Sequence, residues 1–212
     1  MSRADRGGEA ESTRSRGGRP LDSSRDPVFR EAALALLAEV GYDRLTMEAV
    51  AVRAGAAKTT IYRRWPGKAE LVVDALNSLK GDPDIADTGS LRHDLRALAE
   101  SITSAEGELG ARVTIGMVNA LVRDTELRKV FADRFIAPRM TGFRTVFERA
   151  VARGEMPVGH DLDLLAGLFP ALALQELVST GELPDTRLAC RLMDEVVYCL
   201  ATAPPPAPDT TE

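Results

Sequence analysis

The side chains best suited to chemistry in this 212-residue chain are five cations in a short stretch near the N-terminus. No acid separates them between Glu48 and Glu70, and threonine and tyrosine hydroxyls lie among them. Lys and Arg neutralise phosphates, and hydroxyl groups bond to phosphate oxygens and base edges. These residue types therefore predict contact with nucleic acid. The five cations are Arg53, Lys58, Arg63, Arg64 and Lys68.

Two short helices joined by a glycine turn are predicted to position these side chains. Thr46 is a suitable N-cap for the first helix, and Gly55 permits a tight turn after it. The second helix is expected over residues 57–64, with Ile61 and Trp65 directed toward the core as a brace. A helix held in this way fits the major groove of duplex DNA. Its outward face would carry Lys58, Thr59, Thr60, Tyr62, Arg63 and Arg64.

The charge of the chain is distributed unevenly. The net charge of −5 and the pI near 5.3 would disfavour nucleic acid if the charge were uniform. Residues 1–68, however, hold 13 Lys and Arg against 9 Asp and Glu, whereas residues 69–212 hold 14 against 23. Because local charge governs contact with phosphates, the acidic average does not exclude a DNA partner.

Composition and spacing favour helices packed on helices. Ala and Leu are abundant, aromatic residues make up 5% of the chain, and no segment alternates like a strand. Pro138 is expected to break or kink its helical segment, and Pro170 to kink the next one. The fold class is therefore predicted to be all-α. The helical segments are expected at 27–40, 47–54, 57–64, 66–80, 91–105, 109–122, 125–153, 162–180 and 186–202.

The pattern divides the chain into two domains and two tails. Residues 26–80 form the predicted helix-turn-helix DNA-binding domain, with three helices and a linking helix. A Gly/Asp/Pro-rich joint, Gly81–Gly89, leads into a larger helical ligand-binding and dimerisation domain at 81–202. Residues 1–25 are expected to be a flexible arm, and residues 203–212 a disordered tail. Five of its arginines, Arg3, Arg6, Arg14, Arg16 and Arg19, leave two interpretations of the arm open: contact with DNA, or a solvated segment.

Other classes of protein are disfavoured. No run of 18 apolar residues and no apolar signal region occur, so we expect no membrane insertion and a cytoplasmic location. The spacing of Cys190 and Cys199 on one helix excludes a bridge between them. The isolated His93 and His160 predict no metal site. No phosphate loop or nucleophile–base pair is visible, so we expect no cofactor and no enzymatic activity.

The helix-turn-helix residues also carry a family resemblance. The string from Ala51 to Leu71, AVRAGAAKTTIYRRWPGKAEL, resembles the DNA-binding domain of the TetR family of bacterial transcriptional regulators. It has the family's Ala-Gly turn, Thr-x-Tyr, an aromatic residue and Gly-Lys-x-x-Leu, and the preceding A-x-x-L-L-x-x-x-G-Y-x-x-L-T-M is similar to the family's first helix and its exit. Two positions depart from the pattern. Ala56 replaces a larger aliphatic residue, and Ala57 replaces a serine that often caps the recognition helix.

The resemblance implies roles for individual residues. Lys58, Thr59 and Thr60 would touch bases and phosphates, and Tyr62 and Lys68 would meet the DNA backbone. The two arginines that follow the tyrosine occupy variable positions, so base reading by them is a hypothesis. The complete candidate DNA-contact set is Thr46, Lys58, Thr59, Thr60, Tyr62, Arg63, Arg64 and Lys68.

The larger domain is expected to hold a ligand pocket and a dimer interface. Aromatic and Met side chains line small-molecule pockets, although at helical spacing they also form cores. The pocket candidates are Met117, Leu121, Phe131, Phe135, Phe143, Phe147 and Phe169. The last two helical segments carry more apolar surface than one packed side requires, and the resemblance favours dimer contact over burial in the chain's own core. The interface candidates are Leu165, Leu172, Leu188, Leu192, Val196 and Cys199.

The resulting prediction is a sequence-specific DNA-binding transcriptional regulator. The resemblance implies a homodimer that binds a palindromic operator in double-stranded DNA and is released by a small-molecule effector of unidentified class. Two variants stay open: a ligand-responsive activator, and a helical interaction module that does not bind DNA. A small all-α enzyme is a further alternative, but no catalytic motif supports it.

Overall fold

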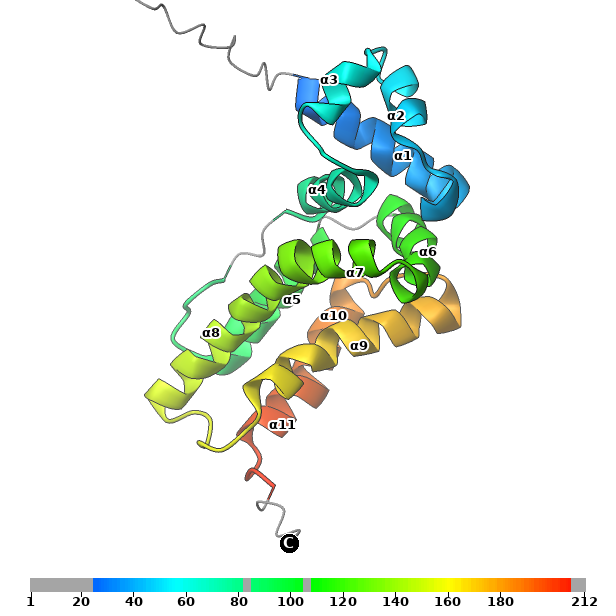
Figure 1. The fold of residues 1–212 in the computed structure, drawn as a ribbon. Helices are drawn as coiled ribbons and strands as arrows, with labels where there is room; N and C mark the ends of the chain where they lie inside the picture. Colours follow the sequence, from blue (N-terminus) through cyan, green and yellow to red (C-terminus); the bar gives the residue numbers. More distant parts are fainter. Residues whose placement is uncertain (1–24, 82–84, 105–107, 207–212) are drawn as a thin grey trace, which may run out of the picture.

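The structure, a computed structural model, describes residues 25–81, 85–104 and 108–206. Every regular element in these ranges is helical, so the prediction of an all-α protein is confirmed. Figure 1 shows an elongated molecule in which α1 to α4 lie at one end and the other helices follow. The predicted arm, except for Arg25, lies outside the described residues.

Four helices form the N-terminal group: α1 (Asp26–Arg44), α2 (Met47–Arg53), α3 (Lys58–Tyr62) and α4 (Lys68–Lys80). Within α1, Gly41 leaves helical geometry with a φ of 75°, at the residue where the sequence predicts the helix to end. α4 begins at Lys68, two residues later than predicted, because Gly67 before it is extended.

Local capping chemistry sets the limits of α2 and α3. The Thr46 hydroxyl accepts a hydrogen bond from the backbone N–H of Ala49 at 3.1 Å, which confirms the predicted cap. Gly55 has a φ of +58°, a left-handed conformation that L side chains rarely adopt. Ala57 precedes α3 without a side-chain cap, as expected from its methyl group.

The second group contains the remaining helices, and two π-helical turns continue one helix into the next. In chain order the elements are α5 (Leu91–Ser104), α6 (Glu108–Arg123), α7 (Thr125–Phe131), η2 (Ala132–Ile136), α8 (Ala137–Arg153), α9 (Leu162–Thr180), α10 (Thr186–Leu192), η3 (Met193–Tyr198) and α11 (Cys199–Thr202).

The sequence predicts a break or a kink at Pro138, and the break does not occur. The chain stays helical from α7 through η2 into α8, with the proline in the first turn of α8. Proline has no N–H to donate to the carbonyl of Arg134, but the side-chain amide of Asn77 in α4 donates to that carbonyl at 3.0 Å. A neighbouring helix thus satisfies the orphaned acceptor. α9 likewise continues past Pro170.

The molecule has two hydrophobic cores, and the boundary between them does not coincide with the boundary between the two groups of helices in sequence. The second core joins α5, α8, α9 and the C-terminal helices. The first core is built on α1 to α4, yet it also takes side chains from α6, α7 and η2. These added residues are Val113, Met117, Ala120, Leu127 and Phe135. Part of the larger domain is therefore packed as an extension of the smaller one.

The C-terminal part of the joint between the two groups, which includes Ala86 and Asp87, is bonded to α8. Arg149 donates to the carbonyl of Ala86 at 3.2 Å, and Arg153 pairs with Asp87 at 3.1 Å. The side chain of Ile85 lies so close to Gly142 that a Cβ there would approach it to 2.9 Å. The part of the predicted joint that the structure describes is thus held in place.

Asp94 is a buried carboxylate at the start of α5, with 1% of its surface exposed. It accepts hydrogen bonds from the N–H and hydroxyl of Thr88, at 2.7 and 2.6 Å, and from Arg153 at 3.0 Å. Burial alone would raise its pKa, but the bonds from Thr88 and Arg153 outweigh burial and lower the pKa. Asp94 therefore stays ionised at neutral pH and ties three segments together.

The chain end is partly ordered. The imidazole Nε2 of His160 lies 2.9 Å from the carbonyl oxygen of Ala203, and Pro205 lies against Gly159. Residues 203–206, which the sequence assigns to the tail, are not helical and contact the segment before α9. The rest of the predicted tail lies outside the described residues.

Candidate nucleic-acid interface and apolar cavity

The outward face of α3 lies at the end of the molecule away from the C-terminal helices (Figure 1). The opposite side of the same helix is anchored by Ile61, which is fully buried. Tyr62 is 41% exposed, and the Lys58 ammonium lies 5.5 Å from the centre of its ring. The predicted residues that are exposed or half-buried here are Lys58, Thr59, Thr60, Tyr62 and Arg63.

Acids outside the basic stretch neutralise part of its charge. Lys58 pairs with Glu48 of α2, and the hydrogen bond to that carboxylate raises the pKa of the lysine. Arg53 makes two hydrogen bonds to Glu39 of α1, at 2.8 and 3.0 Å. Exposed ion pairs of this kind contribute little to stability because water screens them. DNA phosphates can therefore replace both carboxylates at a small cost in free energy.

Arg64 does not belong to the exposed face, so this part of the predicted DNA-contact set is wrong. Its side chain is 7% exposed and pairs with Asp26 at the start of α1. Among the described residues, its buried Nε has no hydrogen-bond partner. α3 ends at Tyr62, so helical spacing no longer sets the direction of Arg64, and the following turn aims it at α1.

Lys68 is partly buried and joins α4 to the end of α1. Its ammonium donates to the carbonyl of Tyr42 at 3.0 Å and lies 4.0 Å from the centre of that ring. The Tyr42 side chain is buried, and burial and the nearby Asp124 carboxylate both raise its pKa. Lys68 therefore braces helices in this structure, and a phosphate contact would require it to turn outward.

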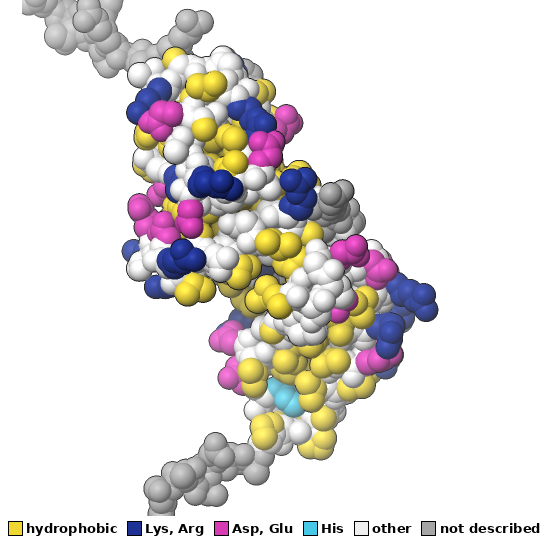
Figure 2. Space-filling model, turned by 90° about the vertical axis from the view of Figure 1, so that its right-hand side faces the viewer, with side chains coloured by type: hydrophobic (Ala, Val, Ile, Leu, Met, Phe, Trp, Pro, Cys, Tyr) yellow, Lys and Arg dark blue, Asp and Glu magenta, His cyan; other side chains and the backbone are white. Residues whose placement is uncertain are grey.

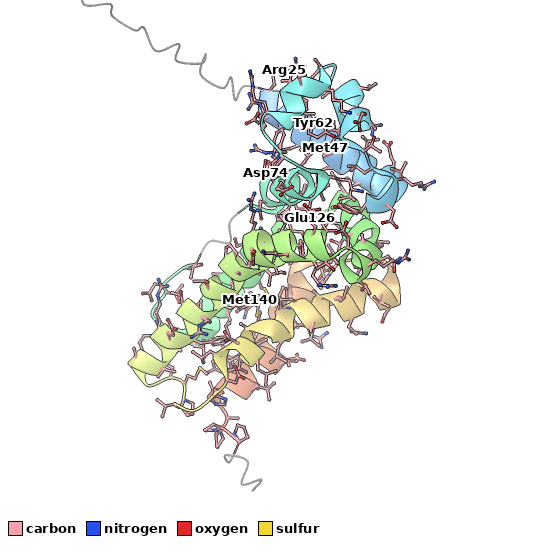
Figure 3. All side chains as sticks on the ribbon, viewed as in Figure 1. Arg25, Met47, Tyr62, Asp74, Glu126 and Met140 are labelled. Carbon is pink, nitrogen blue, oxygen red and sulfur yellow. The ribbon has the colours of Figure 1, made fainter. Side chains whose placement is uncertain are left out.

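Trp65 is a structural brace, as the sequence predicts. It is buried and packs edge-on against Phe29, with ring centroids 5.8 Å apart. Its indole N–H donates to Asp74 of α4 at 2.9 Å, and Arg30 of α1 donates to the same carboxylate oxygen at 2.8 Å. Asp74, which Figure 3 labels on α4, thus holds the linking helix against the helix-turn-helix.

A cavity of about 300 Å³ lies in the second group of helices. Its wall includes five of the predicted pocket residues: Leu121, Phe131, Phe135, Phe143 and Phe169. Met140, which Figure 3 labels on α8 beside α9, also lines it. This residue was not predicted from the sequence. Neither was the rest of the wall, which consists of Lys80, Gly81, Ile102, Thr103, Thr114, Val118, Ile136, Arg139, Pro170, Ala173, Leu174, Leu183 and Pro184.

Two predicted pocket residues lie elsewhere. Met117 is buried in the first core, against the N-terminal helices, and Phe147 is buried in the second core. Both lie on helices that contribute to the cavity, but on other faces of them. The helical spacing of Thr114, Val118 and Leu121 was the signal that could have identified the correct face of α6.

α6 presents one face to the cavity and another to α1. The cavity face is Thr114, Val118 and Leu121, and the buried residues of the other face are Val113, Met117 and Ala120. Gly116 lies at the crossing, where a Cβ would be 2.8 Å from the backbone oxygen of Leu37 in α1. Glycine is required there because no side chain fits between the helices.

Asn77 makes a second connection between α4 and the cavity wall. Its amide nitrogen donates to the Arg134 carbonyl, and its amide oxygen accepts from Arg139 at 3.0 Å. Arg139 also donates to the carbonyl of Gly81, the residue after α4, at 2.7 Å. Because Arg139 and Gly81 both line the cavity, α4 ends on the cavity wall.

Apolar side chains are exposed along α9 and at the chain end. Leu164 is 67% exposed and Val178 77%, and Leu200 is also exposed. By length and composition α9 could cross a membrane, but a single helix of this kind is weak support for a membrane protein. Figure 2 shows hydrophobic side chains spread over the lower part of the face it presents.

The predicted interface residues divide into two sets. Leu165 is buried in the chain's own core, so its assignment to an interface is wrong, and its neighbour Leu164 has the outward direction instead. Cys199 is exposed and Cys190 buried, and both are free thiols, as the spacing predicts. The remaining candidates, all half-buried, are Leu172, Leu188, Leu192 and Val196.

The fold and the site define a class of protein: a helix-turn-helix DNA-binding protein joined to a helical domain with an apolar cavity. Comparison with protein families gives the same result. Residues 29–75 match the family described as bacterial regulatory proteins, tetR family, and residues 85–196 match the tetracyclin repressor-like C-terminal domain. Among the described residues, no group of three or more His, Cys, Asp or Glu could hold a metal ion.

Individual relatives agree with the family match. An uncharacterised helix-turn-helix regulator of Mycobacterium tuberculosis is 34% identical over 186 residues, covering 84% of this chain and 91% of the relative. A protein of Mycobacteroides abscessus named DNA-binding transcriptional repressor TetR is 34% identical over 179 residues, covering 84% and 94%. A TetR-family regulator structure from a Rhodococcus species gives a TM-score of 0.69 at 17% identity, covering 84% and 99%.

The chain therefore belongs to the TetR family of helix-turn-helix transcriptional regulators. Regulators of this family bind DNA operators, act as dimers and are typically repressors. The protein is accordingly a non-enzymatic, DNA-binding transcriptional regulator.

Proposed function

We propose that a homodimer of this chain represses transcription from a dyad-symmetric operator and that a small molecule in the apolar cavity releases it. α3 spans only five residues, Lys58–Tyr62, and one such helix reads too few base pairs for useful specificity. Two copies, related by symmetry, would present two recognition helices to successive major grooves. The exposed apolar residues of α9 and the chain end are the surface on which the copies would meet. Such a regulator would act in the bacterial cytoplasm.

The DNA contacts proposed for each α3 follow from exposure. Lys58 would exchange its Glu48 partner for a phosphate, and Thr59, Thr60 and Arg63 would reach base edges or backbone. The Tyr62 hydroxyl would donate to a phosphate oxygen. The Thr46 hydroxyl accepts a bond from within α2 and retains a proton that it could donate to the DNA backbone.

Control by an effector is supported by the position of α6, which lines the cavity with one face and packs against α1 with another. Protein interiors are close-packed, so a ligand whose shape or size does not match the empty cavity must displace its wall. On α6 that wall is one face of a helix whose other face contacts α1 without an intervening side chain at Gly116. A small displacement of α6 would therefore move α1 and, in a dimer, change the spacing of the two recognition helices. Half-sites lie ~34 Å apart, so altered spacing breaks the fit.

A footprint of the purified protein on the DNA upstream of its own gene tests the operator proposal. We expect a protected, dyad-symmetric sequence and an affinity that falls steeply with salt. Lys58→Ala and Tyr62→Ala should each weaken binding, whereas Arg128→Ala on α7 should not. Unchanged occupancy in both α3 variants would mean that the helix-turn-helix does not contact DNA. A reporter gene that loses expression when the regulator is deleted would indicate an activator.

A further inference from the structure

The cavity wall is dominated by apolar and aromatic groups. Fourteen of its nineteen residues are apolar, and four of these are phenylalanines. Phe131 and Phe135 stack with ring centroids 4.7 Å apart, and Phe143 and Phe169 lie 6.4 Å apart. Ring faces and edges of this kind favour an aromatic ligand over a flexible polar one. The volume of about 300 Å³ admits only a small molecule.

The charged groups of the wall disfavour ions of either sign. Among the described residues that line the cavity none is acidic, and the two charged ones, Lys80 and Arg139, are cationic. A cationic ligand would be repelled by both and would find no carboxylate. An anion would have to compete for Arg139 with three oxygens, those of the Asn77 side chain and of the Phe135 and Gly81 carbonyls. Lys80, the other cation of the wall, also has an interaction of its own, so an anion would have to displace a partner there too.

The two hydroxyl groups of the wall are oriented as acceptors. Thr114 donates its proton to the carbonyl of Gly110 at 2.8 Å. Thr103 lies 2.9 Å from the carbonyl of Ala99 and 2.9 Å from the hydroxyl of Thr186. Since a helical carbonyl takes the proton in each case, each hydroxyl has lone pairs left to receive a hydrogen bond. A ligand N–H or O–H is the complementary group.

We infer that the effector is an uncharged, small aromatic compound that carries one hydrogen-bond donor, in the class of aryl amines and phenols. The inference rests on the proposed function, because it names the ligand for the cavity through which release would occur. An uncharged ring compound would bury its surface against the phenylalanines, and its donor would bond to Thr114.

Two matched dyes test the inference on the full-length protein. N-phenyl-1-naphthylamine is uncharged and has one N–H, and 8-anilinonaphthalene-1-sulfonate has the same rings and N–H with an added sulfonate. Titration by fluorescence should give one site per chain, with a Kd at least tenfold lower for the uncharged dye. Thr114→Val, which replaces only the hydroxyl with a methyl group, should raise the Kd of the uncharged dye severalfold.

Cavity-filling variants locate the dye. Met140→Trp should abolish binding of the uncharged dye, whereas Val158→Trp, in an exposed loop, should not change it. Val118→Phe fills the same cavity from α6 and replaces Met140→Trp if circular dichroism shows that variant to be unfolded. Equal or tighter binding of the sulfonate dye would overturn the inference. Undiminished binding of the uncharged dye to the filled variants would also overturn it, by placing the dye on another surface.

Operator occupancy is measured separately, so the two proposals fail in different ways. If the uncharged dye binds in the cavity but leaves a DNA footprint unchanged at saturation, effector control is contradicted while the chemical class of the cavity's ligand is supported. If a charged metabolite instead releases the operator through this cavity, effector control stands and the inferred ligand class is wrong.

Discussion

At the scale of single residues, two adjacent arginines have opposite environments. Arg63 is exposed beside α3, whereas Arg64 is buried against Asp26. We expect Arg64→Ala to lower the free energy of unfolding by about 1–3 kcal/mol, because it leaves the Asp26 carboxylate without its partner. Arg63→Ala should leave stability within about 0.5 kcal/mol of the parent and weaken operator binding instead.

Urea unfolding and fluorescence anisotropy with labelled operator DNA would separate the two arginine effects. Each variant is the control for the other, because they remove the same group one residue apart. If Arg64→Ala unfolded like the parent protein and bound DNA more weakly, its buried ion pair would have no structural importance.

The buried carboxylate of Asp94 predicts a pH dependence. Its pKa is lowered in the folded protein, so it stabilises the fold above its unfolded pKa of ~3.9, and this stability is lost as pH falls through the folded pKa. Asp94→Asn should therefore be less stable than the parent at pH 7, by about 1–3 kcal/mol, with the difference shrinking toward pH 3. Chemical denaturation at several pH values would check this, and a constant difference would contradict it.

The core positions of Ile61 and Trp65 and the capping role of Thr46 were predictable from sequence, whereas the contacts of Arg64 and Lys68 were not. Ile61 and Trp65 were correctly assigned to the core from spacing, and Thr46 was correctly assigned as a cap. Arg64 was assigned to the exposed face although it follows the last residue of α3, and the contact of Lys68 with Tyr42 could not be foreseen because Tyr42 is remote in sequence. No local pattern encodes such contacts.

At the scale of elements, Asn77 and Pro138 form a unit built from two helices. Asn77→Ala should lower the free energy of unfolding by about 0.5–1.5 kcal/mol, because it removes the hydrogen bonds to the Arg134 carbonyl and from Arg139 at a site that water can partly reach. In a Pro138→Ala background the loss should be smaller, since the restored N–H can bond to that carbonyl itself.

A double-mutant cycle by urea unfolding measures this dependence. We expect an interaction energy of at least about 0.5 kcal/mol between positions 77 and 138. Asn119, an exposed residue of α6, supplies the control, because Asn119→Ala combined with Pro138→Ala should be additive. Additivity of the Asn77 pair as well would show that the amide does not compensate for the proline.

The positions of the helices could be predicted from apolar periodicity and from glycine, proline and capping residues. Which helices pack against one another could not. Gly41 and Gly55 marked turns correctly, because left-handed backbone is a local requirement. The expected break at Pro138 did not occur, because a side chain from α4 satisfies the freed carbonyl. The importance of Gly116 was invisible in sequence, since it depends on how closely α1 approaches α6.

At the scale of the whole molecule, the exposed apolar face of α9 predicts a dimer. Leu164→Lys and Val178→Lys would place charges in a buried interface, so each should shift the protein toward monomer and weaken operator binding at least tenfold. Val158→Lys, at an equally exposed valine outside α9, should change neither property. Analytical ultracentrifugation measures the assembly, and unaltered dimers in both α9 variants would move the interface elsewhere.

The fold class could be predicted from the sequence, but the packing of the helices into cores could not. Helix order, the all-α class and the family resemblance followed from composition and motif. The division into cores did not, because α6 and α7 follow the joint in sequence yet pack with the helices that precede it. Met117 was assigned to the cavity for this reason.

Trp65 is the single tryptophan of the chain. Its indole is bonded to Asp74 of α4, in the half of the molecule that faces DNA, and the cavity wall contains no tryptophan. The protein therefore carries an intrinsic fluorescent probe within the helix-turn-helix group. Changes in its emission wavelength or lifetime as a compound is added would report movement of the linking helix directly, with no label attached and no DNA present.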